Sequence, residues 1–202
     1  MIRYISFDIG GVASSKNREA IVAKGAERWP DFTYSDFKRM FIPQWKGMEK
    51  DYWRLFQNGL IRAEEYLSAS MYTGKFPDTN ENRQHFRAVL KLFTHWYQPV
   101  LAVAQDLKQQ GYHTSILTNN NEILFAEDGL VAIVDTVVSS HHIHASKPDR
   151  RAYEILLERI GATNPGDVLF TDDKEKNVKA AEQAGIRGYH FRSRELPMNE
   201  AF

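Results

Sequence analysis

The feature that most constrains the fold is an alternation of short hydrophobic runs with longer helix-like stretches after Pro99. Runs of β-branched and aromatic residues indicate strands at residues 115–117, 134–138, 168–170 and 189–191. Between these runs, hydrophobic residues recur every three or four positions, which is the spacing of one face of a helix. Alternating strands and helices predict an α/β fold in which a parallel sheet is covered by helices on both faces.

The N-terminal half of the chain has two parts of different character. Residues 2–7 have the composition of a buried strand, which is ended by Asp8 and two glycines. Residues 15–95 are rich in aromatic and charged residues with helix-like spacing, and their proline and glycine breakers divide them into about four helices. We therefore predict that residues 1–14 and 96–202 form one α/β core, and that residues 15–95 form an all-helical insert.

Composition and charge exclude several classes of protein. The 26 Lys and Arg residues balance the 26 Asp and Glu residues, so the chain has no basic excess with which to hold a nucleic acid. The absence of cysteine excludes disulfides, zinc–thiolate sites and thiol nucleophiles. No segment approaches the roughly 20 hydrophobic residues that span a bilayer, and the N-terminal hydrophobic run is too short for a signal peptide. We therefore expect a cytoplasmic protein with neither a nucleic-acid nor a membrane partner.

Polar residues follow four of the predicted strands, at or near the point where each strand ends. In an open parallel sheet, ligands bind outside the carboxyl ends of the strands, so these side chains are expected to converge on one edge. The set consists of Asp8 after the first strand, Thr118 and Asn119 after the second, Lys147 in the loop after the third, and Asp172 and Asp173 after the fourth.

This set has the chemistry of a site for a phosphoryl group and a divalent cation. Carboxylates from Asp8, Asp172 and Asp173 suit a hard cation such as Mg²⁺, which would also relieve their mutual repulsion. Lys147 and Thr118 can hold phosphoryl oxygens. Each residue alone has a simpler structural explanation, such as a turn, a helix cap or a surface lysine. Their coincidence at strand ends favours a functional site.

In order and spacing, these segments resemble the four motifs of the haloacid dehalogenase superfamily. The motifs are matched by FDIGGV at residues 7–12, ILTNN at 116–120, SKPDRRAY at 146–153 and LFTDDKEKNVKAAEQAG at 169–185. The helical insert resembles the C1 cap domain of that superfamily, with NGLIRAEEY at residues 58–66 similar to a recurrent cap segment. The resemblance implies a Rossmann-like catalytic core with a helical cap.

The resemblance also implies roles for individual residues. Asp8 would be the nucleophile that forms an aspartyl phosphate, with Lys147 neutralising the charge that develops during transfer. Mg²⁺ would be held by Asp8, by the Gly10 carbonyl and by Asp173.

Further residues take supporting roles by the same resemblance. Asp172 would lie beside the metal, and Asn177 would orient the Lys147 region. The phosphoryl group would be bound by Ile9, Gly10, Thr118, Asn119 and Lys147.

The sequence departs from the phosphatase pattern at Gly10. Most phosphatases of the superfamily have a second Asp at this position, which protonates the leaving oxygen. The interpretation that fits best is a Mg²⁺-dependent phosphatase acting on a small phosphorylated metabolite, such as a sugar phosphate. The alternatives are a dehalogenase-type hydrolase, in which Asp8 displaces halide without a metal, and a non-catalytic regulator that binds a phosphorylated ligand.

Two other groups of residues have chemistry that could suggest a site. The histidines at 141, 142 and 144 are close in sequence, but adjacent side chains on an extended chain point to opposite sides, so we expect a polar loop rather than a metal site. The aromatic residues of the helical insert are expected to form its core rather than a platform for nucleic-acid bases, because the chain has no net charge. These aromatic residues are Phe37, Phe41, Trp45, Trp53 and Phe56.

Overall fold

The computed structural model describes residues 1–47, 49–124 and 128–192, which form two compact units. The sheet unit comprises Met1–Ser15, Trp96–Asn119 and residues 128–192. No helix within the described ranges is long and hydrophobic enough to cross a membrane.

The helical unit comprises Lys16–His95 and residues 120–124. The boundary differs from the predicted one at residues 120–124, which the sequence places in the α/β core. Ile123 and Leu124 are instead buried in the hydrophobic core of the helical unit. Residues 193–202 of the predicted core lie outside the described residues.

The sheet has five parallel strands in the order β5-β4-β1-β6-β7. The strands are β1 (Tyr4–Phe7), β4 (His113–Thr118), β5 (Thr136–Ser139), β6 (Val168–Asp172) and β7 (Arg187–His190). The N-terminal strand β1 lies in the middle, so that Phe7 is level with Ile116 of β4 and with Thr171 of β6. The predicted parallel α/β fold is therefore confirmed.

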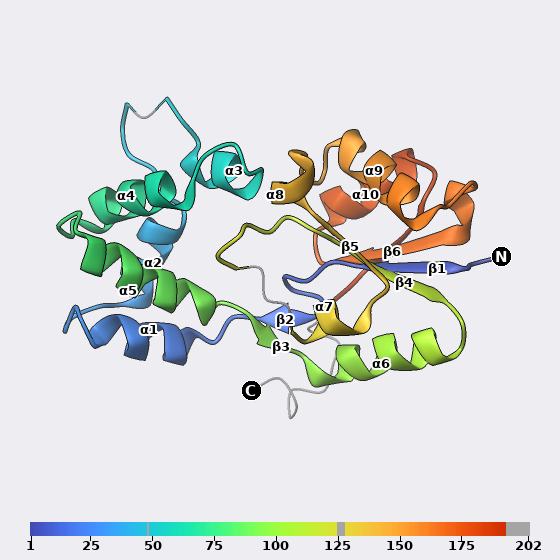
Figure 1. Cartoon of the computed structure of the whole chain (residues 1–202), viewed down its shortest axis with the longest axis horizontal. Helices are drawn as coiled ribbons and strands as arrows, with labels where there is room; N and C mark the ends of the chain where they lie inside the picture. Colours follow the sequence, from blue (N-terminus) through green and yellow to red (C-terminus); the bar gives the residue numbers. More distant parts are fainter. Residues whose placement is uncertain (48, 125–127, 193–202) are drawn as a thin grey trace. The chain divides into compact units, whose positions relative to one another are not determined.

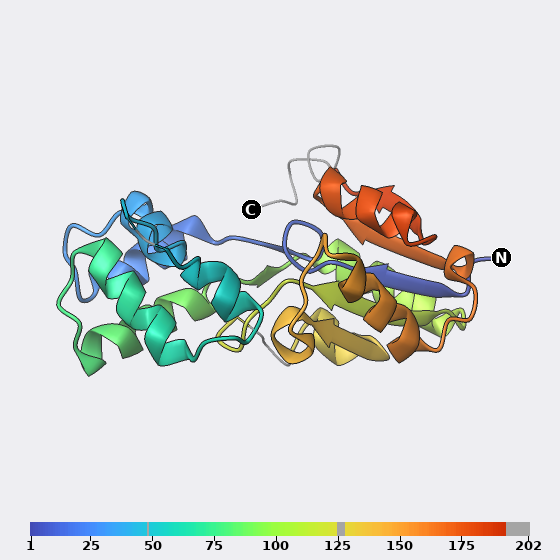
Figure 2. The same cartoon turned by 90° about the horizontal axis from the view of Figure 1, so that it is seen from above.

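Helices cover both faces of this sheet (Figure 1). Helices α9 (Arg150–Ile160) and α10 (Glu175–Gln183) lie on one face, with the short helix α8 (Ser140–Ile143) beside them. Helices α6 (Gln98–Gln109) and α7 (Leu130–Ile133) lie on the other face. In the view from above, the helices run alongside the strands (Figure 2), as expected for strand–helix–strand connections.

Two hydrophobic clusters hold these layers together, one on each face of the sheet. Successive strand residues point to opposite faces, so Ile116 belongs to the cluster with α6 while Leu117 belongs to the cluster with α9. Burial on both faces explains why these strands have continuous hydrophobic runs rather than alternating ones.

The described residues of the helical unit form five helices, against the about four that the sequence predicts. They are α1 (Arg18–Ala26), α2 (Tyr34–Phe41), α3 (Tyr52–Gln57), α4 (Ala63–Gly74) and α5 (Asn80–Lys91). The shortest of them is the six-residue α3, whose N-cap Asp51 accepts a hydrogen bond from the Arg54 amide.

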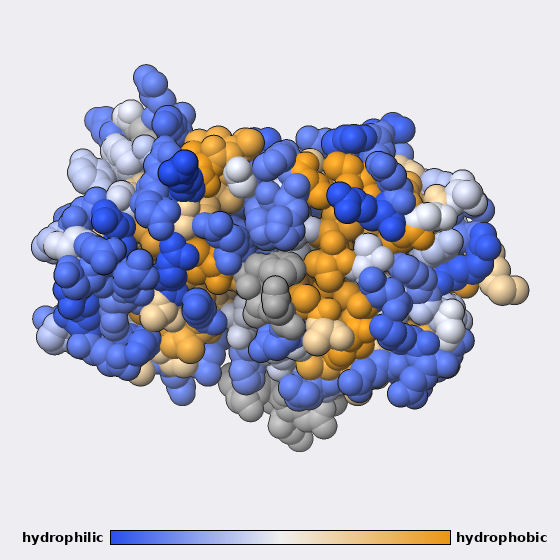
Figure 3. Space-filling model, in the orientation of Figure 1, coloured by the Kyte–Doolittle hydropathy of each residue, from blue (hydrophilic) through white to orange (hydrophobic). Residues whose placement is uncertain are grey.

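The expected aromatic core of the helical unit is confirmed with one exception. Phe37, Phe41 and Phe56 are buried together, and Trp53 packs against them. Trp45 is outside this core and contacts the exposed Tyr72 edge-on, at a centroid distance of 4.8 Å. The face drawn in Figure 3 is largely hydrophilic over the helical unit, with hydrophobic residues visible in smaller areas.

A two-stranded ribbon marks the place where the chain leaves the sheet unit and returns to it. Strand β2 (Ser14–Ser15) pairs with β3 (His95–Trp96). All of the helices α1 to α5 lie between these two strands in the sequence. The ribbon therefore joins the two ends of the helical insert.

Candidate active site

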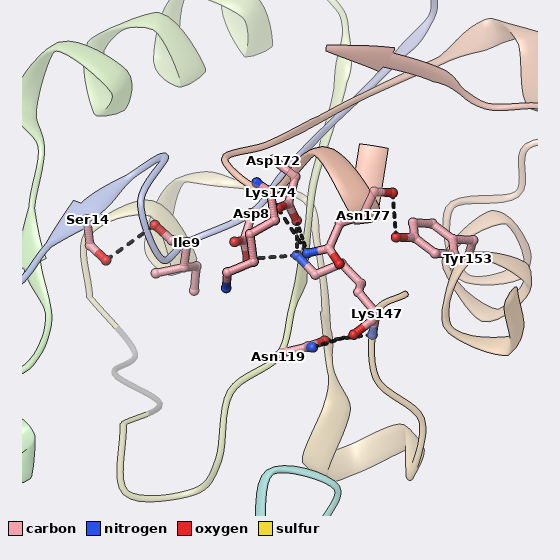
Figure 4. Close-up of polar contacts among 9 residues, drawn as sticks. All are labelled: Asp8, Ile9, Ser14, Asn119, Lys147, Tyr153, Asp172, Lys174 and Asn177. Carbon is pink, nitrogen blue, oxygen red and sulfur yellow. Dashed lines mark hydrogen bonds and ion pairs between the residues drawn. The ribbon is translucent and has the colours of Figure 1, made fainter. Parts of the chain in front are cut away.

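Four of the polar residues predicted to converge, Asp8, Asn119, Lys147 and Asp172, lie close together at the carboxyl ends of the strands (Figure 4). Asp8 follows β1 directly, and its amide continues the sheet by donating to the Thr171 carbonyl oxygen at 2.9 Å. Asp172 is the last residue of β6, the neighbouring strand. Lys147 comes from the segment between α8 and α9. The sheet therefore brings three distant parts of the chain to one edge.

Lys147 lies between two buried carboxylates. Its Nζ is 2.8 Å from Asp8 Oδ1 and 2.7 Å from Asp172 Oδ2, and its side chain is only 1% exposed. The ammonium also lies 5.1 Å from the centroid of the Phe170 ring. One cation thus neutralises part of the charge of two acids that are largely buried.

The backbone of Lys147 is held by the side chain of Asn119. The Lys147 amide donates to Asn119 Oδ1 at 2.8 Å, and Asn119 Nδ2 donates to the Lys147 carbonyl oxygen at 2.8 Å. Asn119 is predicted from sequence to bind the phosphoryl group, and its contact with Lys147 is a feature that the sequence does not indicate. No sequence signal connects the two residues, because they are 28 positions apart.

Both carboxylate oxygens of Asp172 are occupied by hydrogen bonds from the chain itself. Asn177 Nδ2 donates to each oxygen at 2.9 Å, and the Lys174 amide donates to Oδ1 at 2.9 Å. Lys147 contacts Oδ2. Asp172 therefore joins Lys147 to Asn177, for which the orienting role remains a prediction.

Asp173 presents a contrasting carboxylate. Its Oδ1 is buried and has no hydrogen-bond partner among the described residues. Its Oδ2 lies against the turn after β1, where a Cβ atom added to Gly11 would be only 2.5 Å away. Gly11 also has a φ of +85°, which other residues rarely adopt. The turn thus needs glycine in order to admit this carboxylate.

The three aspartates form a group that could hold a metal ion. One oxygen from each of Asp8, Asp172 and Asp173 lies within 4.8 Å of the others. Among the described residues this group contains no histidine.

The histidine cluster noted in the sequence lies elsewhere. His141 and His142 lie in the short helix α8 rather than in the predicted polar loop, and His141 Nδ1 is 2.8 Å from Ser139 Oγ.

Burial dominates the electrostatics of these acids. It raises the pKa of Asp8 above its usual range, although the nearby Lys147 opposes this effect. Burial also raises the pKa of Asp173, where the adjacent Lys174 opposes it. Charged forms of both carboxylates are therefore costly unless further positive charge is present, which a divalent cation would supply.

The turn that follows Asp8 is closed by the Ile9 carbonyl oxygen. This oxygen accepts hydrogen bonds from the Ala13 and Ser14 amides at 2.9 and 2.8 Å. Within the turn, a Cβ atom added to Gly10 would meet nothing within 4 Å. The missing acidic side chain at this position is therefore not explained by lack of space.

Two further residues complete this edge of the sheet. Thr118 is the last residue of β4 and is 3% exposed, at the predicted position. Tyr153 in α9, which the sequence analysis does not assign, donates from its hydroxyl to the Asn177 carbonyl oxygen at 2.7 Å. Burial raises the pKa of Tyr153, so it remains a donor. Tyr153 is buried near the start of α9 and ends the segment that matches the lysine motif. Its place in that segment is the sequence feature that could have identified it.

A family model described as haloacid dehalogenase-like hydrolase matches residues 2–185. The chain belongs to this hydrolase family. The match begins before β1 and extends beyond α10, so it includes every element that supplies the site.

Individual relatives are more distant. The chain is 33% identical over 102 residues to the phosphatase MT3486 of Mycobacterium tuberculosis, which covers 48% of this chain and 46% of that protein. The match thus spans about half the length of that relative.

Solved structures support the fold over nearly the whole chain. A haloacid dehalogenase family enzyme from Bacteroides thetaiotaomicron, in complex with magnesium and inorganic phosphate, superposes with a TM-score of 0.75 at 18% identity. The alignment covers 98% of each chain. The L-2-haloacid dehalogenase of Xanthobacter autotrophicus superposes with a TM-score of 0.69 at 20% identity, covering 99% of this chain and 80% of the other.

Proposed function

We propose that this hydrolase is a Mg²⁺-dependent phosphatase that acts on a small phosphorylated metabolite through an aspartyl phosphate on Asp8. The observation that carries the proposal is the third carboxylate beside the Lys147 ion pairs. Asp173 adds a buried oxygen that no described residue binds, next to Asp8. Nucleophilic displacement of halide from carbon needs no cation, and so has no use for this oxygen. Phosphoryl transfer uses a divalent cation to neutralise phosphoryl oxygens.

The donor set fits Mg²⁺. Asp8 and Asp173 offer carboxylate oxygens, and the Gly10 carbonyl lies in the same turn, which matches the preference of Mg²⁺ for a few oxygen ligands together with water and phosphate. Asp172 would act from beside the metal, because its oxygens already accept hydrogen bonds. When bound, Mg²⁺ would supply positive charge to the phosphoryl oxygens.

The chain's own residues would carry the two chemical steps. In the first, an oxygen of Asp8 attacks phosphorus, and the bond between phosphorus and the leaving oxygen breaks with its electron pair going to that oxygen. In the second, water attacks the same phosphorus, the bond between phosphorus and the Asp8 oxygen breaks to regenerate the carboxylate, and the protons of the water remain with the released phosphate or pass to solvent. Lys147 holds Asp8 in place at 2.8 Å and balances the negative charge on the transferred group. Thr118 and Asn119 would bind phosphoryl oxygens.

The leaving oxygen needs a proton, and Gly10 cannot supply it. Positioned general acids contribute roughly 10² to 10⁴ in rate, so alkyl phosphates should react slowly unless the substrate provides the proton. We therefore expect aryl, acyl or anomeric phosphates to be preferred. An anomeric sugar phosphate satisfies this requirement, and the helical unit would serve as the cap that selects it.

The direct test is release of phosphate from an aryl phosphate with and without Mg²⁺, for the wild type and for Asp8→Asn. The amide is a poor nucleophile at nearly the same volume, so turnover should be lost while thermal melting shows that the fold is retained. Asp106→Asn, at an exposed position on α6, is the matched control and should retain full activity.

Three results would distinguish the alternatives. Activity on 2-haloacids without metal would indicate a dehalogenase. Stabilisation by Mg²⁺ with beryllofluoride, without turnover of any phosphate ester, would indicate a binding protein. An Asp8→Asn variant with substantial Mg²⁺-dependent activity would show that Asp8 is not the nucleophile.

The leaving-group preference has its own test. Single-turnover rates of Asp8 phosphorylation should depend steeply on the pKa of the leaving group. Gly10→Asp should flatten this dependence, since a Cβ atom at this position would meet nothing within 4 Å. A flat dependence in the wild type would show that another group already donates the proton.

A further inference from the structure

The chain passes from the sheet unit to the helical unit immediately after the phosphoryl-binding end of β4. Thr118 and Asn119 are the last residues of this part of the sheet unit, and Asn120 is already part of the helical unit. The passages at 15–16 and 95–96 adjoin the β2–β3 ribbon instead. A single peptide bond therefore joins a proposed ligand-binding residue to the other unit.

Residues 120–124 are firmly held within the helical unit. Ile123 and Leu124 are 5% and 7% exposed and belong to the hydrophobic core that is otherwise formed by helices and loops of residues 21–93. Insertion of two hydrophobic side chains into a packed core leaves this segment little freedom to shift independently of it. We name residues 120–124 the anchor segment.

Side-chain hydrogen bonds make the anchor segment a rigid turn. Asn121 Oδ1 accepts from the amides of Ile123 and Leu124 at 3.0 and 3.1 Å. Asn120 Oδ1 accepts from the Asn121 amide at 3.1 Å, and its Nδ2 donates to the Leu124 carbonyl oxygen at 3.2 Å. Asparagine oxygens commonly fix turns in this way. Residues 120–124 are thus held together by their own side chains.

The other side of the passage is equally constrained. The two hydrogen bonds between the Asn119 side chain and the Lys147 backbone join the end of β4 to the residue that pairs with Asp8. No flexible residue separates the two sets of hydrogen bonds, because Asn119 and Asn120 are neighbours. Asn119 therefore links Lys147 to the point where the chain enters the helical unit.

Asn121 is distinguished by an unused donor. Its side chain is 1% exposed, and its Nδ2 has no partner among the described residues. A buried amide with an unsatisfied donor is destabilising. The benefit of an asparagine at this position must therefore come from the hydrogen bonds that its Oδ1 accepts. That oxygen closes the turn that follows the phosphoryl-binding residues.

We propose that the anchor segment couples the helical unit to the phosphoryl-binding end of β4, and that Asn121 is the positioning residue of this coupling. The proposal rests on the proposed function only for its effect on phosphate binding. Movement of the helical unit on its substrate would then adjust Thr118 and Asn119 directly. Asn121 contacts backbone amides of its own segment and is not a catalytic residue.

The test compares Asn121→Ala and Asn121→Ser with Asn82→Ala. Asn82 is a matched control because it is also a buried asparagine of the helical unit, bonded to Arg28 and to the Pro77 carbonyl oxygen. Hydrogen exchange in peptides covering residues 113–124 should accelerate at least about tenfold in Asn121→Ala. It should remain near wild type in Asn82→Ala, whose effect should fall on α5. Asn121→Ser keeps an acceptor oxygen and should restore most of the protection.

Inhibition by inorganic phosphate with Mg²⁺ gives the second measurement. Asn121→Ala should weaken this inhibition roughly tenfold and raise KM more than it lowers kcat, because the binding residues are misplaced while Asp8 is intact. The exchange measurement does not depend on activity, so it decides the coupling even if the protein is not a phosphatase. If Asn121→Ala does not fold, Asn121→Ser tests the coupling instead. It should accelerate hydrogen exchange at residues 113–124 relative to the wild type, but by less than expected for Asn121→Ala.

Three results would overturn the proposal. The first is wild-type exchange at residues 113–124 in Asn121→Ala. The second is equal acceleration of these peptides in Asn82→Ala, which would indicate general loosening of the helical unit. The third is a weakened phosphate inhibition in Asn121→Ser with wild-type exchange, which would mean that Nδ2 contacts the ligand itself.

Discussion

Replacement of Lys147 by Met tests the ion pairs at the centre of the site. Met has a similar unbranched shape, so the change removes charge with little loss of packing. Asp8 and Asp172 would then face each other without a cation, with oxygens within 4.8 Å. At an effective dielectric constant of about 20, two unit charges at that distance repel by about 3.5 kcal/mol. This agrees with the roughly 3–5 kcal/mol typical of removing one partner from a buried ion pair.

We therefore expect Lys147→Met to lower the free energy of unfolding by about 3–5 kcal/mol at pH 7 in chelating buffer, measured by urea denaturation with circular dichroism. Without the lysine, the pKa of Asp8 rises further above its unfolded value. The cost is then fully present above the folded-state pKa, shrinks as the pH falls through it, and disappears only below the unfolded-state value of about 3.9, where Asp8 is protonated in both states.

A second substitution and a control make the result specific. Asp8→Asn added to Lys147→Met should recover most of the lost stability, because only one buried charge remains. Lys176→Met, at an exposed position on α10, should change stability by less than about 0.5 kcal/mol. A cost below about 1 kcal/mol for Lys147→Met, or no recovery in the double variant, would refute the electrostatic argument.

Three further predictions concern the rest of the molecule. Gly25→Ala should destabilise by about 1–3 kcal/mol in a thermal melt, despite a better helix propensity, because the new Cβ atom would lie 2.0 Å from the Phe32 ring. Burial raises the pKa of Asp135, but hydrogen bonds including that from Lys108 outweigh it and lower the pKa to about 2. The stability advantage of wild type over Asp135→Asn should therefore be full above pH 4 and disappear as the pH falls towards 2, in urea titrations at each pH. Tyr153→Phe should cost about 1 kcal/mol by the same method, because it removes the buried hydrogen bond to the Asn177 carbonyl oxygen.

The sheet and the convergence of the site were predictable because each depends on a local pattern. Hydrophobic runs locate buried strands, and the polar residue that ends each run must lie at the same edge of a parallel sheet. Strand boundaries were less predictable. Strand β4 begins at His113, before the hydrophobic run, because Thr114 is buried with its hydroxyl bonded to Asp135. A buried polar side chain whose hydrogen bonds are made within the protein cannot be recognised as buried from a hydrophobic pattern in the sequence.

The supporting contacts of the site could not be predicted for a different reason. Asn119 meets the backbone of Lys147, and Asn177 meets Asp172, only because separate elements end at the same edge. The assignment of residues 120–124 to the helical unit is of the same kind. Their two hydrophobic side chains fit either unit by composition, and packing decides which.

The central place of β1 in the sheet has a consequence for synthesis of the protein. Tyr4 pairs with His113 on one side and with Val168 on the other, so both neighbours of the first strand emerge from the ribosome long after it. Helices α1 to α5 are complete before either neighbour exists. The helical insert can therefore fold early through local contacts. The backbone groups of β1, the strand before Asp8, stay unpaired until β4 and β6 have been synthesised. A chain of this topology should depend on chaperones for its first residues more than for its middle.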